Sequence, residues 1–183
     1  METTRQIRVA TQADAAGILA IYAPIVEATA TSFEAEPPTL EEMQGRIERT
    51  LMQYPWLVCV EGDRVLGYVY GSSFRARHAY QWSVEVSVYI HPEAQGQGVG
   101  RRLYTELFAL LRRQGYISAY AGATLPNPGS VRLHESMGFE PCGTFPMVGY
   151  KHGAWHSVGF WHLLLQPPPE NLSDPIPFPL LDK

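Results

Sequence analysis

Apolar and polar positions along the chain follow two different periods, and these periods predict both helices and strands. Residues 11–25 and 99–111 carry apolar side chains three and four positions apart, which is the spacing of one buried helix face. In residues 84–90, valine and isoleucine alternate with Glu85, Ser87 and Tyr89, which is typical of a strand with one buried face. The pattern therefore predicts an α/β domain that combines helices with a central sheet.

Capping and turn residues mark the ends of these elements. Thr39 and Glu42 have the spacing of a capping box and start a helix that is expected to run towards Met52. Residues 61–63 separate two apolar runs and predict a hairpin, and Pro128 fits the first position of a further short helix. Strands are expected at residues 6–10, 56–60, 64–70, 80–90, 117–124, 141–148 and 156–165.

The composition indicates one globular domain followed by a tail. The chain has 183 residues, of which 45% are apolar and 17% charged, so it is long enough to bury a sizeable core, which we place in residues 1–166. Residues 167–183 contain six prolines and are expected to form a tail outside the core. Cys59 and Cys142 lie far apart without a metal-binding or redox spacing, and both are expected to be buried as small hydrophobic side chains.

The charge balance excludes several kinds of partner. With 14 Lys and Arg against 18 Asp and Glu, the formal net charge is -4, so no overall positive field favours nucleic acid or an anionic membrane. The first residues lack the basic and apolar regions of a signal peptide, and no apolar run reaches the length of a membrane span. We therefore expect a cytoplasmic protein that binds neither nucleic acid nor a membrane.

A glycine-rich segment, HPEAQGQGVGRRL at residues 91–103, lies between a predicted strand and a predicted helix. It is not a Walker A loop, because arginine instead of lysine follows Gly100, and it is not a dinucleotide fingerprint, because that pattern needs glycine where Arg101 stands. The remaining pattern, Gln-x-x-Gly-x-Gly from Gln95, can present backbone amides to a diphosphate at the start of a helix. A plain glycine-rich turn is the alternative.

This segment resembles the acyl-CoA loop of the GCN5-related N-acetyltransferase (GNAT) family. NPGSVRLHESMGF at 127–139 resembles the family's later signature, and the strings at 54–58, 84–90 and 151–161 are similar to the phosphinothricin and methionine sulfoximine acetyltransferase subgroup. The resemblance covers residues 6–165. It implies the GNAT acyl-CoA N-acyltransferase fold, an α/β (α+β) fold with a mixed, mostly antiparallel central sheet flanked by helices. It also implies acetyl-CoA as the co-substrate and no metal.

The resemblance implies where acetyl-CoA is held. The strand before the glycine loop pairs with the pantetheine arm, the loop covers the pyrophosphate, and the asparagine of the second motif contacts the pantetheine. For this asparagine, helix capping alone is the alternative. The implied cofactor-binding residues are Val88, Tyr89, Ile90, Gly96, Gln97, Gly98, Val99, Gly100, Arg101 and Asn127.

Glu85 and His134 are the candidate catalytic residues. An amine is mostly protonated near neutral pH, so its attack on a thioester needs a base. Glu85 lies on the strand face opposite the valines, and the resemblance implies that it accepts the amine proton; a solvated surface glutamate is the alternative. His134 stands where many relatives have a tyrosine that protonates the thiolate. It shares a helix face with Ser130, and proton donation, pairing with Glu85, orientation of water and a structural role all remain open.

The residues before the predicted strand that carries Glu85 suggest which acceptor is bound. Arg75 and Arg77 match a cationic stretch that, in the subgroup, holds the acidic end of an amino-acid-like substrate, and a guanidinium suits a carboxylate or phosphinate. Phe33 and Tyr80 are the further substrate-binding candidates; solvated arginines and a core-packed Phe33 are the alternatives. The resemblance implies a homodimeric enzyme that acetylates the small-molecule amine of phosphinothricin, methionine sulfoximine or methionine sulfone, with a role in antibiotic or herbicide resistance.

Two other functions compete with this interpretation. A protein or peptide N-acetyltransferase of the same fold is disfavoured by the paired arginines. A CoA-binding sensor without turnover is disfavoured because the chain has both Glu85 and the glycine loop.

Overall fold

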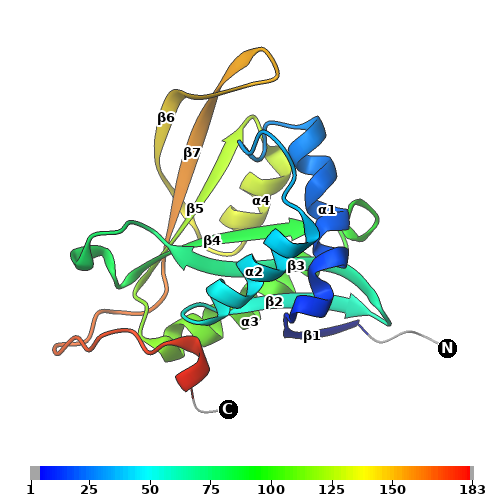
Figure 1. Cartoon of the computed structure of the whole chain (residues 1–183). Helices are drawn as coiled ribbons and strands as arrows, with labels where there is room; N and C mark the ends of the chain where they lie inside the picture. The colour runs from blue at the N-terminus through cyan, green and yellow to red at the C-terminus, as the bar shows by residue number, and fades with distance from the viewer. Residues whose placement is uncertain (1–4, 182–183) are drawn as a thin grey trace.

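The computed structural model describes residues 5–181, and Figure 1 shows the course of the chain. The mixed helix and strand composition agrees with the predicted α/β class. The elements are β1 Arg5–Val9, α1 Ala15–Ala28, α2 Leu40–Leu51, β2 Trp56–Glu61, β3 Arg64–Ser73, β4 Ser83–Ile90, α3 Val99–Gln114, β5 Ser118–Leu125, α4 Pro128–Ser136, β6 Glu140–Lys151 and β7 Ala154–Leu164.

The strands form one seven-stranded sheet in the order β1-β2-β3-β4-β5-β7-β6. Every neighbouring pair is antiparallel except β4 and β5, which are parallel. The register of this parallel pair extends from Ser83 opposite Ser118 to Glu85 opposite Tyr120 and stops there, whereas β4 stays paired with β3 as far as Ile90. One edge of β4 beyond Glu85 therefore has no strand partner.

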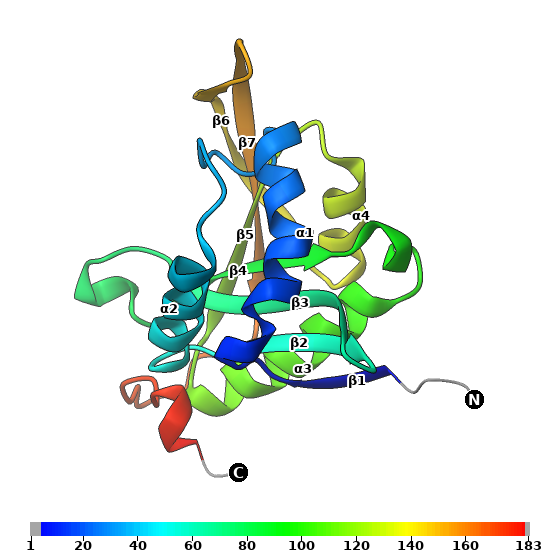
Figure 2. The same ribbon diagram turned by 45° about the vertical axis from the view of Figure 1, so that its right-hand side comes forward.

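Helices cover both faces of this sheet. In Figures 1 and 2, α1 and α2 lie on one face and α3 lies on the other. The alternation in β4 sorts its side chains between the two layers: Val84 and Val86 are buried in the cluster that contains α3, and Tyr89 packs against the cluster under α1 and α2. Glu85 lies between the two valines along the strand and consequently shares the face of Tyr89.

Local signals placed most helix ends correctly. The predicted capping box is present: the Glu42 amide donates to Thr39 Oγ1 at 3.2 Å, and the Thr39 amide donates to Glu42 Oε2 at 2.7 Å. The start of β4 differs from the prediction, because His78–Tyr80 forms a 3-10 turn and the strand begins only at Ser83. The apolar pattern extended across this turn because Tyr80 is itself a residue type favoured in strands.

The prediction that both cysteines are buried is wrong for one of them. Cys59 is fully buried in β2, but Cys142 is exposed. Cys142 lies on β6, which is the last strand of the sheet and has no strand on its outer side, so most of its side chains face solvent. Within residues 5–181, no helix has the length and apolar character needed to cross a membrane.

The proline-rich tail lies outside the sheet and folds back against the end of α3. The Ile176 amide donates to the Gln114 carbonyl at 2.8 Å, and the Gln114 side chain donates to the Ile176 carbonyl at 2.7 Å. Further along, the Phe178 amide donates to the Gln53 carbonyl at 3.2 Å. Gln114 is buried, so these contacts attach the tail to the domain at a point remote from the glycine loop.

Candidate active site

The glycine loop has the backbone conformation that its sequence suggests. Gly96 and Gly98 have φ angles of 72° and 78°, and a Cβ atom on either would meet nothing within 4 Å, so glycine is favoured there by conformation. Gly100 differs, because a Cβ atom there would lie 2.9 Å from Leu133 Cδ2; glycine lets α3 approach α4. The loop leads into the first turn of α3, whose amides lack partners within the helix.

A cavity of about 600 Å3 adjoins this loop. It is bounded by the unpaired end of β4, the glycine loop and the first turns of α3 and α4. Of the predicted cofactor-binding residues, all line this cavity except Gln97, whose side chain accepts from Arg5 and donates to the Glu93 carbonyl, both at 2.5 Å. The lining residues that the prediction did not include are Ile25, Thr31, Ala94, Gln95, Gly129, Ser130, Arg132 and Leu133.

Asn127 contributes a helix cap as well as a cavity wall. Its side-chain Oδ1 accepts from the Ser130 amide at 3.1 Å, so it caps α4. It also lines the cavity, as does Ser130. The two interpretations of Asn127 are therefore compatible, since the same side chain can cap the helix and adjoin a ligand.

Glu85 is a half-buried carboxylate without a local partner. Within residues 5–181 its carboxylate forms no hydrogen bond or ion pair, and burial raises its pKa. It lies further back on the strand whose end, Val88 to Ile90, lines the cavity. Glu85 itself lines neither this cavity nor the smaller one under α1 and α2, so what favours it as a base is the raised pKa, because a carboxylate with a raised pKa binds a proton more strongly.

His134 is buried and hydrogen-bonded through both ring nitrogens. Its Nε2 lies 2.8 Å from the hydroxyl of Tyr104, and its Nδ1 lies 3.2 Å from the hydroxyl of Ser130. The structure thus gives His134 these two partners and not Glu85. Burial lowers the pKa of His134 to about 4, so the ring is neutral at pH 7 and is not an imidazolium donor. His134 itself does not line the cavity, but Ser130 does.

Arg75 and Arg77 lie in the loop of residues 74–82, between β3 and β4, on the Glu85 side of the sheet. The Arg75 guanidinium carbon is 5.3 Å from the ring centroid of Phe74 and 5.6 Å from that of Tyr80. Phe74 stacks on Tyr120, which is the partner of Glu85 in the sheet register. The structure therefore brings Arg75 and Tyr80 together near Glu85.

Arg77 and Phe33 are exposed to solvent, as Arg75 is. Arg77 is exposed, and its carbonyl accepts from the Tyr80 amide at 2.9 Å within the 3-10 turn. Phe33 is 42% exposed, and its ring centroid lies 6.3 Å from that of His156 on β7. Its exposure argues against a simple core-packing role.

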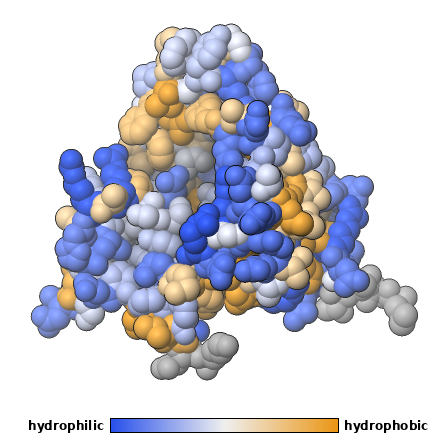
Figure 3. Space-filling view, viewed as in Figure 1, coloured by the Kyte–Doolittle hydropathy of each residue, from blue (hydrophilic) through white to orange (hydrophobic). Residues whose placement is uncertain are grey.

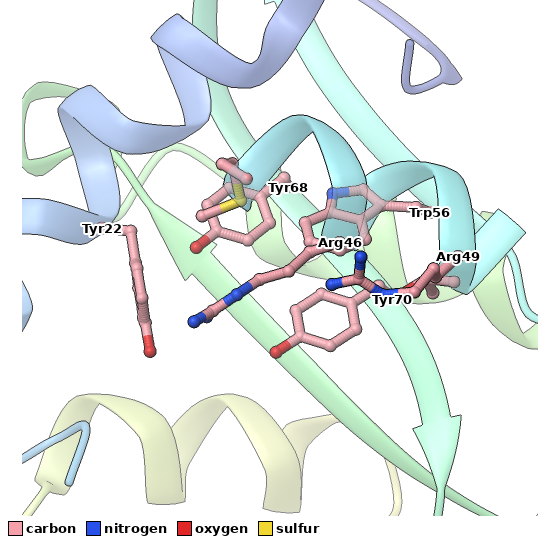
Figure 4. A pocket seen from close by; sticks show the side chains of 8 residues that line it. Tyr22, Arg46, Arg49, Trp56, Tyr68 and Tyr70 are labelled. Atoms are coloured by element: carbon pink, nitrogen blue, oxygen red, sulfur yellow. The ribbon is translucent and has the colours of Figure 1, made fainter. Parts of the chain in front are cut away.

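A second, smaller cavity of about 170 Å3 lies below α1 and α2 (Figure 4). Figure 4 shows the guanidinium of Arg46 extending between the rings of Tyr22 and Tyr70. This guanidinium is already paired, because it donates to both carboxylate oxygens of Glu34 at 2.6 and 3.0 Å, and the Tyr22 hydroxyl donates to Glu34 at 2.8 Å. Sequence reasoning missed this network, since no spacing rule relates residue 34 to residue 46.

The splayed parallel strands and the glycine loop before α3 define a class of protein: an acyltransferase that uses an acyl-CoA. The chain matches the model of the acetyltransferase (GNAT) domain over residues 7–158 and belongs to this family. It is 43% identical to a phosphinothricin N-acetyltransferase of Streptomyces viridochromogenes, over 85% of each chain. It is 38% identical to an L-methionine sulfoximine/L-methionine sulfone acetyltransferase of Salmonella typhimurium, over 87% of this chain and 94% of that protein.

A solved structure supports the same assignment. The crystal structure of a GNAT superfamily phosphinothricin acetyltransferase from Sinorhizobium meliloti in complex with AcCoA matches with a TM-score of 0.85 and 35% identity, over 92% of this chain and 95% of that chain. The predicted family, fold and similarity to the subgroup are confirmed, and the protein is an N-acetyltransferase. Among residues 5–181, no group of three or more His, Cys, Asp or Glu side chains is placed to hold a metal ion.

Proposed function

We propose that this enzyme transfers the acetyl group of acetyl-CoA to the amino group of a small amino-acid-like acceptor of the phosphinothricin, methionine sulfoximine or methionine sulfone type. The observation that carries the proposal is the cavity formed by the glycine loop and the unpaired edge of β4, with Glu85 on the same strand. The names of the similar enzymes support the choice of acceptor.

Acetyl-CoA would occupy the larger cavity. The backbone of Val88 to Ile90 offers an unpaired strand edge to the amide groups of the pantetheine arm, and the loop from Gly96 offers its amides to the pyrophosphate. Arg101 lines the same cavity and is steadied by a hydrogen bond of 3.2 Å from its guanidinium to the Ser136 carbonyl. The solved relative from Sinorhizobium meliloti, which is a complex with AcCoA, supports this assignment.

The proposed reaction is direct acetyl transfer. Glu85 removes a proton from the acceptor ammonium group, the free amine attacks the thioester carbonyl, and the tetrahedral intermediate collapses with cleavage of the C–S bond. The acetyl group stays on the nitrogen, the electron pair of the broken C–S bond goes to the sulfur, and the second amine proton passes to that sulfur. The products are the amide, free CoA thiol and a protonated Glu85. No covalent enzyme intermediate or metal is required by this sequence of steps.

His134 would act through Ser130 and not as an acid. Burial raises the pKa of Tyr104, so its hydroxyl remains protonated and donates to Nε2 of the neutral imidazole. The ring proton is then on Nδ1 and points to Ser130. The Ser130 hydroxyl, having accepted this bond, keeps its own proton for the cavity, where it can donate to the leaving sulfur. His134 is thus a positioning residue in this mechanism.

The acceptor would bind on the face of the sheet that carries Glu85. Arg75, beside Tyr80, would pair with the acidic group of the acceptor, and Phe33 would form another wall. Arg75 and Arg77 are both exposed, and Arg77 would add to the attraction of the anion.

We further propose that the enzyme works as a homodimer in the cytoplasm, where acetylation of the acceptor would give resistance to it. Residues 145–156 of β6 and β7, which we call the arm, extend beyond the last pair of β5 with β7 (Figure 1). Hydrophobic residues gather on part of this surface in Figure 3, and such a surface on an edge strand is normally covered. The exposed apolar residues of the arm are Phe145, Met147, Val148, Tyr150 and Trp155.

Release of free thiol from acetyl-CoA tests the proposal. Wild type and Glu85→Gln are each offered phosphinothricin, methionine sulfoximine, methionine sulfone and a short peptide. We expect turnover with the small acids and a large loss in the variant. Turnover with the peptide alone would instead establish a peptide acetyltransferase, and acetyl-CoA binding without turnover would establish a sensor.

A further inference from the structure

We infer that Gly149 and Lys151 on β6 are positioning residues for the acceptor site, because they fix Phe33 against the arm. The inference rests on the proposed function, in which Phe33 forms a wall of the acceptor site. It adds a link that neither the sequence motifs nor the similar proteins provide: the arm sets where that wall stands.

Gly149 receives the ring of Phe33. A Cβ atom on Gly149 would lie 2.3 Å from Phe33 Cζ and 2.6 Å from each Cε atom, distances that side chains do not tolerate. Gly149 is not among the glycines with positive φ, so close approach, and not backbone conformation, is what favours glycine here. His156 is opposite Gly149 in the β6–β7 register and also faces the ring. Phe33 therefore lies flat on the backbone of the arm.

Lys151 holds the segment that carries Phe33. Its Nζ donates to the Val26 carbonyl at 2.6 Å and to the Ser32 carbonyl at 2.7 Å. Val26 lies in the last turn of α1, where carbonyls have no partner within the helix and favour a positive charge. One ammonium group thus joins the end of α1, the residue before Phe33 and the arm.

The residue after Phe33 is held from the other side. Glu34 accepts both hydrogen bonds of the Arg46 guanidinium and one from the Tyr22 hydroxyl. The backbone on either side of Phe33 is therefore fixed, by Lys151 on the arm and by Arg46 on α2. The clash of an added methyl group at Gly149 cannot be relieved by moving this backbone. The ring must therefore turn away from the arm and leave the position proposed for the acceptor wall.

The test compares Gly149→Ala with Gly143→Ala. Gly143 lies on the same strand, and a Cβ atom there meets nothing within 4 Å, so this matched control adds the same methyl group without the clash. We expect Gly149→Ala to raise the acceptor KM about ten- to a hundredfold, with a smaller change in kcat. The Kd for acetyl-CoA, measured by calorimetry, should stay within about twofold of wild type, because the glycine loop and β4 are unaffected.

A second pair of variants separates positioning from a loss of folding. Phe33→Leu in the Gly149→Ala background shortens the displaced side chain, and the KM effects of the two changes should be non-additive. Lys151→Met should also raise the acceptor KM. Its melting temperature should equal that of Gly143→Ala, which is the reference for a harmless change on β6.

Each outcome decides a separate claim. Equal acceptor KM values for Gly149→Ala, Gly143→Ala and an active wild type would overturn the inference and leave the proposed function intact. Additive effects of Phe33→Leu and Gly149→Ala would overturn it as well. A wild type that transfers acetyl to none of the small acids would defeat the proposed function, and the inference with it.

Discussion

Replacing Tyr104 with phenylalanine removes one hydroxyl and should slow the reaction from inside the core. Tyr104 and His134 are 0% and 3% exposed, so water cannot replace the lost donor at Nε2 of the imidazole. An unsatisfied buried group costs about 1–3 kcal/mol of folding free energy. The imidazole would also lose the bond that fixes its proton on Nδ1, and with it the direction of the Ser130 hydroxyl.

The expected loss in kcat follows from one hydrogen bond to the leaving sulfur. At about 0.5–1.5 kcal/mol for such a bond, kcat should fall roughly 2- to 12-fold at saturating acetyl-CoA and acceptor. Thiol release measures kcat, and urea unfolding measures the folding free energy. Tyr116→Phe is the matched control, because Tyr116 is equally buried and its hydroxyl accepts from Gln53 at 3.1 Å, away from the cavity.

The comparison of the two variants decides whether Tyr104 affects catalysis through His134 and Ser130. Equal stability losses with a kcat loss confined to Tyr104→Phe would support the chain from Tyr104 through His134 to Ser130. An unchanged kcat in Tyr104→Phe, or equal kcat losses in both variants, would refute the reasoning.

Three further outcomes are expected. Glu85→Gln should abolish most turnover without weakening acetyl-CoA binding in calorimetry. In the wild type, kcat/KM should fall as the pH drops through the raised pKa of Glu85, and a flat pH profile would argue against a carboxylate base. Gly98→Ala forces a side chain into a φ of 78°, which costs about 1–2 kcal/mol of conformational energy, and should weaken acetyl-CoA binding. Gly62→Ala also places a side chain at positive φ, but in the β2–β3 turn, and should leave acetyl-CoA binding unchanged. The pKa of His134 is lowered to about 4, so the unfolded chain binds that proton first as the pH falls. His134 alone should therefore lower the unfolding free energy by roughly 3 kcal/mol between pH 7 and pH 4, and a His134→Gln variant should lose this part of the pH dependence in urea titrations.

Local chemistry made the outline of the fold predictable. Thr39 and Glu42 satisfy each other's backbone amides within one helical turn, and the glycine loop leads directly into α3, so short stretches of sequence were enough to place these ends. Tyr80 shows where the same approach fails: its side chain favours a strand, but the backbone bonds of the 3-10 turn from Arg77 decide its conformation.

The support behind the candidate residues was not predictable, because it depends on the order of strands in the sheet. His134 had a foreseeable neighbour in Ser130, one helical turn away, but its closer partner Tyr104 comes from another helix. Lys151 likewise reaches Val26 across the molecule. A single sequence records no such proximity, since the spacing rules of helices and strands relate only residues within one element or one hairpin.

Glycine illustrates this limit most directly, because the same letter stands for two physical requirements. Gly98 is needed for a backbone angle, which the turn between a strand and a helix already suggests. Gly149 is needed because another residue's ring occupies the place of its Cβ atom, and that residue, Phe33, is remote in sequence. A substitution at the first should disturb the cofactor and one at the second the acceptor. Glycines of the second kind therefore mark contacts between distant segments, and in this enzyme the contact joins Phe33, the proposed acceptor wall, to the arm.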